Sequence, residues 1–394
     1  MQHCPRGLWF FGLVSAVTLV ISTGGSVPQV DAQDKGKTPK ADDAKSVDIL
    51  TIDQVELKAK FYPAKGKDAT CVILLHALGE SSDNKEWNNF AKKLQEKGFA
   101  VMTFDFRGHG ESTTVRPGMP NPKNPQLAVK GFWDQQLNQQ GIKGYAANKP
   151  RPTEIKYENF SANYYPVVCN DLAAVRAWLD ERDDINPNSL VLIGAKDGGT
   201  IGALWLNSEF HRFRFFKGEP GQPPKLDRQN PEGGAFAGCV WLSMSNTPGT
   251  TKSAINIAGM LEQPGKINKL PMLFLYGQGD DKGKTLAVAC DKYITGTDKD
   301  SKKQYPNTAS LPIEKSGKDA GRELLVQDYD TVAVILDYLD KLPASKLAKA
   351  PRRSGDESFM WEFTNPKTGR VEDAPARETG SKQLRFSGYS SFMR

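Results

Sequence analysis

The chain has 394 residues and a formal net charge of +6, with 52 Lys and Arg against 46 Asp and Glu. A near balance of this kind is typical of a mixed surface. It excludes the strongly basic composition by which many proteins bind nucleic acid, so we expect no nucleic-acid partner. The length suits one large α/β domain with appendages, or two domains.

The first residues have the features of a secretory signal peptide. A short basic start precedes the apolar run Leu8–Ile21, which is too short for a comfortable membrane span. The small-residue site Val30–Ala32 predicts cleavage after Ala32. We therefore expect residues 1–32 to be removed, residues 33–45 to form a solvated linker, and the protein to be exported to the periplasm or the extracellular space. An uncleaved N-terminal anchor is the alternative. We expect no transmembrane span in the mature chain, because no later stretch is apolar enough.

Beyond the linker, apolar strand segments alternate with amphipathic helices, which is typical of a parallel sheet covered on both faces. In chain order, the pattern predicts one or two strands over Val47–Tyr62, then strands over Thr70–Leu75, Ala100–Phe104, Leu190–Ile193, Cys239–Met244, Pro271–Tyr276 and, at an edge, Ala309–Glu314. Helices are predicted over Glu86–Lys97, Asp171–Asp180, Gly199–Leu206 and Tyr329–Leu342.

Two segments depart from this alternation. Residues 113–165 are an insertion, with a long irregular stretch that is rich in Pro and Gly and also carries aromatic residues. Long loops of this kind are usually functional or mobile, so we consider both a lid over a cleft and a packed surface excursion. Residues 343–394 form a polar, basic tail, in which Asn365–Gly369 has the composition of a turn and a small β hairpin is considered.

Four cysteines follow the predicted signal peptide, and they lie in or beside apolar strands and helices. Disulfide pairing is open to an exported protein, but this placement favours buried free thiols. No C-x-x-C pair exists, so a zinc or thioredoxin-type site has no support, and we expect no metal or other cofactor. The residues are Cys71, Cys169, Cys239 and Cys290.

Four short motifs each follow an apolar strand segment. They are His76-Ala-Leu-Gly79, Asp105-Phe-Arg-Gly-His-Gly-Glu-Ser112, Gly194-Ala-Lys-Asp-Gly198 and Tyr276-Gly-Gln-Gly-Asp280. In this order they resemble the α/β-hydrolase superfamily, closest to its esterase, dienelactone-hydrolase and acyl-peptidase-like branches, over about residues 46–342. The resemblance implies an α/β fold with a mostly parallel, eight-stranded sheet and helices on both faces. The motif residues it implies are His76, Gly79, Asp105, Gly108, Gly194 and Gly198.

The resemblance also implies a catalytic triad, of which two members are replaced. A strand, a Gly-rich turn and a helix form the setting of a nucleophile elbow, and Lys196 stands where the family has serine. Ala320 occupies the histidine position in the turn after the last strand. The carboxylate is present as Asp280, with Asp281 as a second candidate. Hydrolysis by this mechanism needs all three groups, so we predict that no intact catalytic set remains.

Other chemistry around the elbow stays open at this point. A shifted register offers Asp197 as a nucleophile, and a helix N-terminus could make Lys196 a reactive amine. We favour an ion pair of Lys196 with Asp280, or second with Asp319. The backbone N–H groups of Leu78 and Asp197 are the expected oxyanion-hole donors, as implied by the family.

The sequence therefore predicts an exported α/β-hydrolase-fold protein that has lost catalysis and has a binding or scaffolding role. A small molecule or peptide is the expected ligand class for the cleft. The alternatives are an active ester or amide hydrolase with an unorthodox site around Lys196 or Asp197, and a cell-surface structural protein.

Overall fold

The computed structural model describes residues 44–66, 68–119, 130–216, 225–251, 254–352, 358–364 and 371–375. The predicted signal peptide and nearly all of the predicted linker lie outside these residues, as do residues 120–129 of the insertion. Side chains are described except in residues 214–216, 225–226 and beyond 352.

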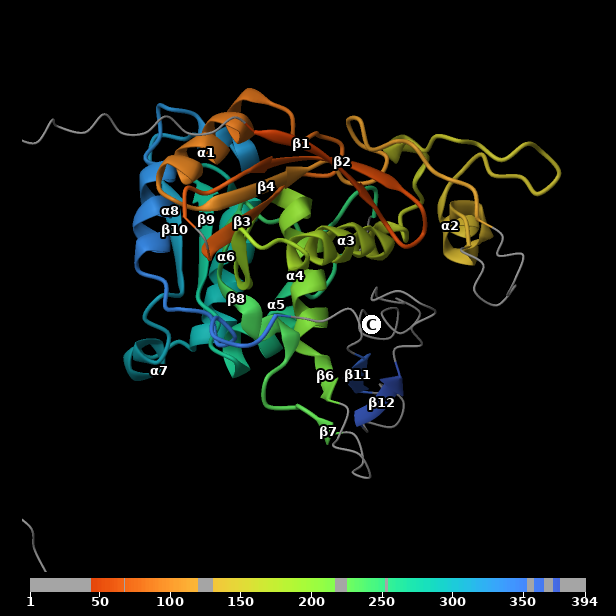
Figure 1. The fold of residues 1–394 in the computed structure, drawn as a ribbon. Coiled ribbons are helices and arrows are strands. Elements are labelled where there is room, and N and C mark those ends of the chain that lie inside the picture. Colours follow the sequence, from red (N-terminus) through yellow and green to blue (C-terminus); the bar gives the residue numbers. More distant parts are fainter. Residues whose placement is uncertain are drawn as a thin grey trace, which may run out of the picture. The chain divides into compact units, whose positions relative to one another are not determined.

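Eight strands form the main sheet, in the order β1-β2-β4-β3-β5-β8-β9-β10 (Figure 1). β1 and β2 pair antiparallel, β2 pairs antiparallel with β4, and every later pair is parallel. The predicted mostly parallel eight-stranded sheet is therefore confirmed, with β10 at an edge as its proline suggested. The strands are β1 (Lys45–Leu50), β2 (Glu56–Tyr62), β3 (Ala69–Leu75), β4 (Ala100–Phe104), β5 (Ile185–Ala195), β8 (Phe236–Leu242), β9 (Met272–Gly277) and β10 (Ala309–Ile313).

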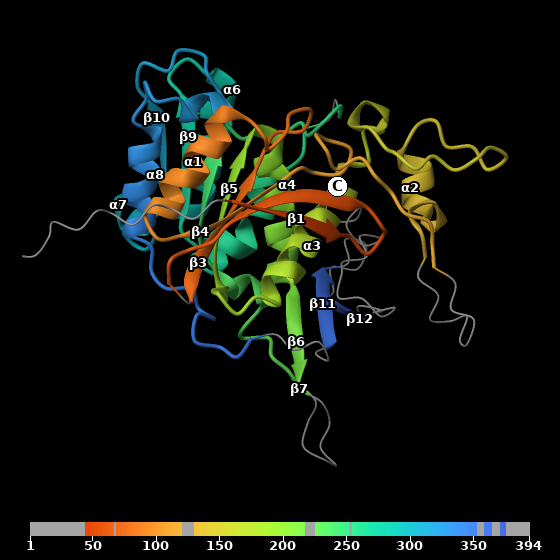
Figure 2. The ribbon, with the colours of Figure 1, turned by 45° about the horizontal axis from the view of Figure 1, so that its top comes forward.

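Helices cover both faces of this sheet, as predicted. Alternate residues of a strand point to opposite faces, so Val72 and Leu74 of β3 belong to one core and Ile73 and Leu75 to the other. α1 (Lys85–Glu96) and α8 (Thr331–Asp340) cover the first face, and α3 (Cys169–Asp180), α4 (Lys196–Phe210) and α6 (Asp281–Thr295) cover the second. Figure 2 shows α1 and α8 on one side of the strands and α3 and α4 on the other.

α1 illustrates how the sequence determines a helix here. The Asn84 side chain accepts a hydrogen bond from the N–H of Trp87 and so caps the first turn. Trp87, Phe90 and Leu94 recur at helical spacing and are buried against the sheet. The short helices α2 (Gln136–Gly141), α5 (Ile257–Met260) and α7 (Lys299–Lys303) lie in connections.

The described part of the insertion is anchored to the domain. Phe132 and Trp133 are buried, and the Tyr145 ring stacks on Trp133 with centroids 5.1 Å apart. The Asn138 amide of α2 donates to a carboxylate oxygen of Asp53 at 3.0 Å, which ties the insertion to the loop between β1 and β2. Through these contacts, the described residues of the insertion pack on the surface of the domain. Some residues of the range 157–165, at its end, also line a small hollow.

A second, four-stranded sheet has the order β12-β11-β6-β7. It joins β6 (Arg212–Phe216) and β7 (Lys225–Leu226), which follow α4, to β11 (Ser358–Thr364) and β12 (Val371–Pro375) of the tail. The sequence predicted no strand over Arg212–Phe216. β6 and β11 pair antiparallel although they lie far apart in the chain, and local patterns carry little information on such pairing.

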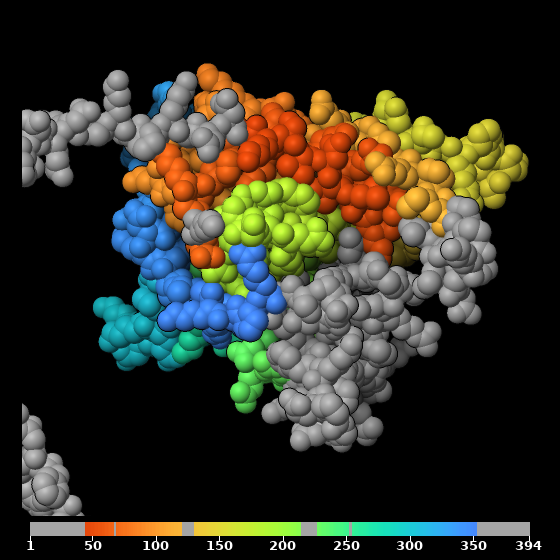
Figure 3. All heavy atoms as spheres, viewed as in Figure 1, coloured from red at the N-terminus to blue at the C-terminus, as the bar shows by residue number. Residues whose placement is uncertain are grey.

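The segment that follows α8 is fixed to the start of β5. The side-chain amides of Asn186 and Asn188 donate to the backbone carbonyls of Ala348 and Ala350, each at 2.9 Å. The Arg352 guanidinium donates to the carbonyl of Ile185 at 2.8 Å. In Figure 3 this blue segment runs beside the yellow-green residues near the start of β5. The first residues of the tail are thus part of the folded body.

The four cysteines of the described chain are buried and unpaired, as predicted. Burial raises the pKa of each thiol well above its usual range. Among the described residues, no helix combines the length and the apolar character that crossing a bilayer would require.

Candidate functional site

The turn between β5 and α4 has the backbone geometry of a nucleophile elbow. Lys196 has a φ of 48°, a left-handed conformation that side chains other than glycine rarely adopt. The flanking residues must be small. A Cβ on Gly198 would lie 1.9 Å from the carbonyl oxygen of His76, and one on Gly194 would lie 2.5 Å from the Cα of Gly199. The strained residue is therefore Lys196 and not Asp197, which supports the first of the two registers.

The Lys196 side chain pairs with a residue that the sequence analysis did not consider. Its Nζ lies 3.6 Å from a carboxylate oxygen of Glu80, and its aliphatic carbons lie against Gly321, where a built Cβ would come within 2.8 Å of Cγ. The predicted pairing with Asp280, or with Asp319, is wrong. Lys196 instead extends over the turn that begins at Ala320, where the family has its histidine.

Glu80 belongs to a short chain of alternating charges. Its second oxygen accepts a hydrogen bond from Arg322 Nε at 2.7 Å, and the same guanidinium donates to Glu86 of α1 at 2.9 Å. The charged groups are about a quarter exposed, with side-chain exposures of 22–32% for Lys196, Glu80 and Arg322. The Lys196 ammonium is thus held in a salt-bridge network.

The other carboxylates that were candidates for the triad or for the ion pair do not contact Lys196. Asp280 caps α6, accepting a hydrogen bond from the N–H of Gly283 at 2.9 Å. Asp281 is the exposed first residue of that helix. Asp319 accepts a hydrogen bond from the hydroxyl of Tyr329 at 2.7 Å. The turns after β9 and β10 do lie side by side, because a Cβ on Gly277 would lie 2.1 Å from the Asp319 carbonyl oxygen.

One of the two expected oxyanion donors, the N–H of Leu78, is bonded to the carboxylate of Asp197, together with the N–H of Gly249, which was not expected. Asp197 Oδ1 accepts from the N–H of Leu78 at 2.8 Å, and its Oδ2 accepts from the N–H of Gly249 at 3.0 Å. Burial raises the pKa of Asp197, while the two N–H donors act in the opposite direction. The N–H of Leu78, which the resemblance assigns to the oxyanion hole, is therefore already occupied by the chain itself.

His76 and His109 are held inside the scaffold. His76 is buried, with Nδ1 2.7 Å from the Ala77 carbonyl oxygen and Nε2 accepting from the N–H of Phe106 at 3.0 Å. Burial and, to a lesser extent, the nearby His109 lower the pKa of His76 to about 4. His109 Nδ1 lies 2.8 Å from the Arg107 carbonyl oxygen. Neither ring is placed as a base for the elbow.

The other motif residues shape the loops around the elbow. Asp105 Oδ1 accepts hydrogen bonds from the N–H and the hydroxyl of Ser82, at 2.7 and 2.8 Å. Gly79 and Gly108 have φ values of 85° and 73°, which favour glycine. A Cβ on Gly108 would also lie 2.6 Å from the ring of Phe160. These positions are structural.

Ser243 lies next to the elbow in the sheet, and the sequence analysis did not single it out. In the register of β5 and β8, Ala195 pairs with Leu242, so Lys196 and Ser243 are the residues that follow this pair. Ser243 also has a φ of 48°, and its hydroxyl is buried with no hydrogen-bond partner among the described residues. The sequence signal for Ser243 is weak: it follows an apolar strand segment, as Lys196 does.

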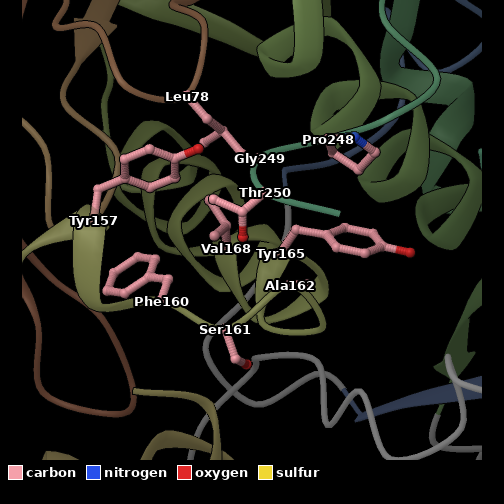
Figure 4. Close-up of a pocket in the computed structure, with 10 residues that line it drawn as sticks. All are labelled: Leu78, Tyr157, Phe160, Ser161, Ala162, Tyr165, Val168, Pro248, Gly249 and Thr250. Carbon is pink, nitrogen blue, oxygen red and sulfur yellow. The ribbon is translucent and has the colours of Figure 1, made fainter. Parts of the chain in front are cut away.

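A small hollow is lined in part by Leu78 and Gly249, the two residues that donate to Asp197. Figure 4 shows its lining, with the Tyr157 hydroxyl pointing toward Leu78 and Gly249. The enclosed space is about 10 Å³, which is room for about one water molecule. The lining residues come from the loop after β3, the end of the insertion, the turn before α3 and the loop after β8: Leu78, Tyr157, Phe160, Ser161, Ala162, Tyr165, Val168, Pro248, Gly249 and Thr250. Within the described chain, no group of three or more His, Cys, Asp or Glu is placed to hold a metal ion.

Comparison with known proteins agrees with this architecture. Residues 70–208 match the family described as alpha/beta hydrolase fold. An uncharacterized abhydrolase domain-containing protein of Dictyostelium discoideum is 36% identical over 73 residues, which is 18% of this chain and 8% of that protein. The matched segment is thus a small fraction of the relative's length.

Solved structures with a similar course of the chain include an esterase of Pyrococcus furiosus, which is 16% identical with a TM-score of 0.46, over 80% of this chain and 96% of the esterase. A predicted CIB-like hydrolase of Thermoplasma acidophilum is 11% identical with a TM-score of 0.41, over 75% and 98% of the two chains. At this identity the likeness carries no information on activity.

Proposed function

We propose that this chain, an α/β-hydrolase-fold protein, binds a small molecule or peptide in its cleft and does not hydrolyse it. The proposal depends on one observation: the strained residue of the elbow is Lys196, and its ammonium pairs with Glu80. An ammonium held by a carboxylate is a poor nucleophile, because its lone pair is protonated.

The surrounding groups support the same conclusion. Acyl transfer by this fold needs a base beside the nucleophile and free N–H donors for the oxyanion. Ala320 has no group that can accept a proton, and the Lys196 side chain covers the adjacent Gly321. The Asp197 carboxylate accepts the N–H of Leu78, so this donor is not free for an oxyanion, and the negative charge beside it opposes a second one.

Hydrolysis of p-nitrophenyl butyrate by the purified chain tests the proposal, with Lys196→Ala as the matched variant. We expect the two proteins to give the same rate, equal to that of an equally treated protein without an esterase site. Lys196→Ser alone is expected to remain inactive, because position 320 still supplies no base. Turnover by the natural chain that Lys196→Ala abolishes would overturn the proposal.

A second candidate function is hydrolysis by a serine–lysine pair. Ser243 and Lys196 follow paired positions of neighbouring strands, and serine–lysine variants of the triad exist. Two observations weigh against this candidate: Ser243 is only 5% exposed, and Lys196 is paired with Glu80. Ester turnover that is lost in both Ser243→Ala and Lys196→Ala would favour it.

We also propose that the protein is exported, with cleavage after Ala32. The basic start, the apolar run and the small-residue site support this proposal. N-terminal sequencing of the protein purified from its native host tests it, with Gln33 as the expected first residue. A first residue within the run Leu8–Ile21, or an intact Met1, would contradict it.

A further inference from the structure

Asp197 connects two loops that flank the elbow. β5 lies between β3 and β8 in the main sheet, and Asp197 is in the first turn of α4, the helix that follows β5. Its Oδ1 accepts from the N–H of Leu78 in the loop after β3, and its Oδ2 accepts from the N–H of Gly249 in the loop after β8. One carboxylate at the end of the middle strand therefore joins the loops of both neighbouring strands.

This carboxylate is held by neutral donors. Over the described ranges, no lysine or arginine forms an ion pair with Asp197, and the ammonium of the adjacent Lys196 pairs with Glu80. Hydrogen bonds from backbone N–H groups to a charged oxygen are stronger than those between neutral groups, and the N-terminus of α4 also favours a negative charge. The N–H groups of Leu78 and Gly249, here called the donor pair, thus have the chemistry of a carboxylate site, and the carboxylate in it belongs to the chain itself.

The two loops leave little room between them. Leu78 and Gly249 both line the small hollow, whose enclosed space of about 10 Å³ is room for about one water molecule. A Cβ on Gly249 would lie 3.4 Å from the Tyr157 hydroxyl oxygen and 3.6 Å from a methyl carbon of Leu78. Both oxygens of Asp197 are engaged, so an external carboxylate can use the donor pair only after Asp197 has left it.

We propose that the donor pair is a carboxylate-binding site that the chain keeps closed with its own Asp197. Asp197 is then an autoinhibitory contact, because it holds the loops after β3 and β8 together and excludes other carboxylates from the N–H of Leu78. The proposal goes beyond the proposed function, since it concerns the closure of the site and not the loss of the nucleophile. It gives Asp197 a positioning role, exerted through the two loops.

Replacement of the carboxylate by formate tests the proposal on the full purified chain. Asp197→Ala removes one carbon and two oxygens, which are the heavy atoms of formate. We expect the amides of Leu78 and Gly249 to exchange hydrogen about tenfold faster in this variant than in the natural chain, because each loses its acceptor. Formate at about 0.2 M should then slow both by about threefold relative to chloride at equal ionic strength. NMR of the labelled chain resolves the two amides.

Two further variants separate the site from general effects. Asp281→Ala removes an equal charge, on an exposed side chain, from the first turn of α6, a helix of the same length as α4. Its donor pair should exchange as in the natural chain, with no response to formate in either protein. Asp197→Asn keeps the shape and one acceptor oxygen, so one amide of the donor pair should stay protected while the other exchanges faster. This variant decides the question if Asp197→Ala does not fold.

Three results would overturn the proposal. They are unchanged exchange of both amides in Asp197→Ala, unchanged exchange of both in Asp197→Asn, and a formate effect on Asp197→Ala no larger than that of chloride. Hydrolysis of p-nitrophenyl butyrate, measured on the same samples, keeps this inference apart from the proposed function. Ester turnover that depends on Lys196 overturns the proposed function, whereas hydrogen exchange alone decides whether Asp197 closes the donor pair.

Discussion

Arg107 and Lys196 each follow a strand of the main sheet, and each is paired with carboxylates in a different environment. Arg107 is fully buried and donates to Asp53 at 2.7 and 3.0 Å and to Asp171 at 2.8 Å. Lys196 is about one-third exposed and forms a longer contact of 3.6 Å with Glu80. The first arrangement holds loops of the scaffold together. The second occupies the position at which a hydrolase of this fold carries out chemistry.

The comparison shows that this chain keeps the motif residues that shape the backbone, whereas the side chain at the elbow differs from the serine of the family. The turn after β4 keeps its glycines and its buried hydrogen bonds. The elbow keeps its glycines and its strained backbone, but its side chain is an ion-paired lysine. Sequence motifs that specify the backbone are therefore a poor guide to the activity of the side chains they position.

The largest expected effect is on Arg107. Arg107→Met leaves the buried carboxylates of Asp53 and Asp171 without their cation, so we expect a loss of about 3–5 kcal/mol in the free energy of unfolding. Arg116→Met, at an arginine whose side chain is 52% exposed and pairs with Glu56, should cost about 0–1 kcal/mol. Urea denaturation of the two variants measures both. Similar losses would remove the distinction between a buried and a surface pair.

The pH dependence of His76 should be the next largest effect. Burial lowers its pKa in the folded chain to about 4, against about 6.5 when unfolded. As pH falls from 6.5 to 4 the unfolded chain takes up the proton first. The stability that the neutral ring contributes is therefore present above pH 6.5 and lost on acidification, by roughly 2–3 kcal/mol.

His76→Asn isolates this contribution, because it removes the titrating ring. The stability gap between the natural chain and the variant should narrow between pH 7 and pH 4.5. NMR of the imidazole nitrogens should show a neutral His76 ring at pH 5.5. A ring that titrates near pH 6.5 would show that the loop is open to water.

A glycine of the elbow should have a smaller effect, through overpacking. A methyl group at Gly198 would approach the His76 carbonyl oxygen to 1.9 Å, so Gly198→Ala should cost about 1–3 kcal/mol. Gly66→Ala is the control, since nothing lies within 4 Å of its built Cβ. Thermal unfolding compares the two, and a tolerant Gly198 would mean that the elbow can shift away from the loop after β3.

The smallest expected effect concerns the strained backbone at Lys196. Lys196→Gly and Lys196→Ala both remove the ammonium, but only glycine adopts a φ of 48° without strain. The glycine variant should therefore be more stable than the alanine variant by about 1 kcal/mol. The reverse order in urea denaturation would mean that the backbone relaxes when the lysine is removed.

Much of the fold could be predicted from the sequence, because a strand that is buried on both faces of the sheet consists of a continuous run of apolar residues. Thr70–Leu75 was expected as a strand, and β3 spans Ala69–Leu75. The pairing of β6 with β11 could not be predicted, since it joins distant parts of the chain and leaves no local periodicity. The hairpin considered for the tail, from the turn composition of Asn365–Gly369, is formed by β11 and β12.

The strained elbow could also be located, from Gly194 and Gly198, but the partners of its side chain could not. Asp280 was expected to pair with Lys196 because the family has an acid there. The segment Asp280–Gly283 instead has the pattern of a helix cap, which satisfies the carboxylate locally. Glu80 follows Gly79 directly, and only the course of that loop over the elbow brings it to Lys196.

Labelling with a fluorophosphonate probe, followed by mass spectrometry of the intact chain and its peptides, tests the central claim most directly. This reagent modifies a serine only when a neighbouring base and oxyanion donors activate it. The account predicts no adduct on the natural chain under conditions that fully label a serine esterase. A stoichiometric adduct on a serine, with Ser243 the first peptide to inspect, would contradict the loss of hydrolytic chemistry.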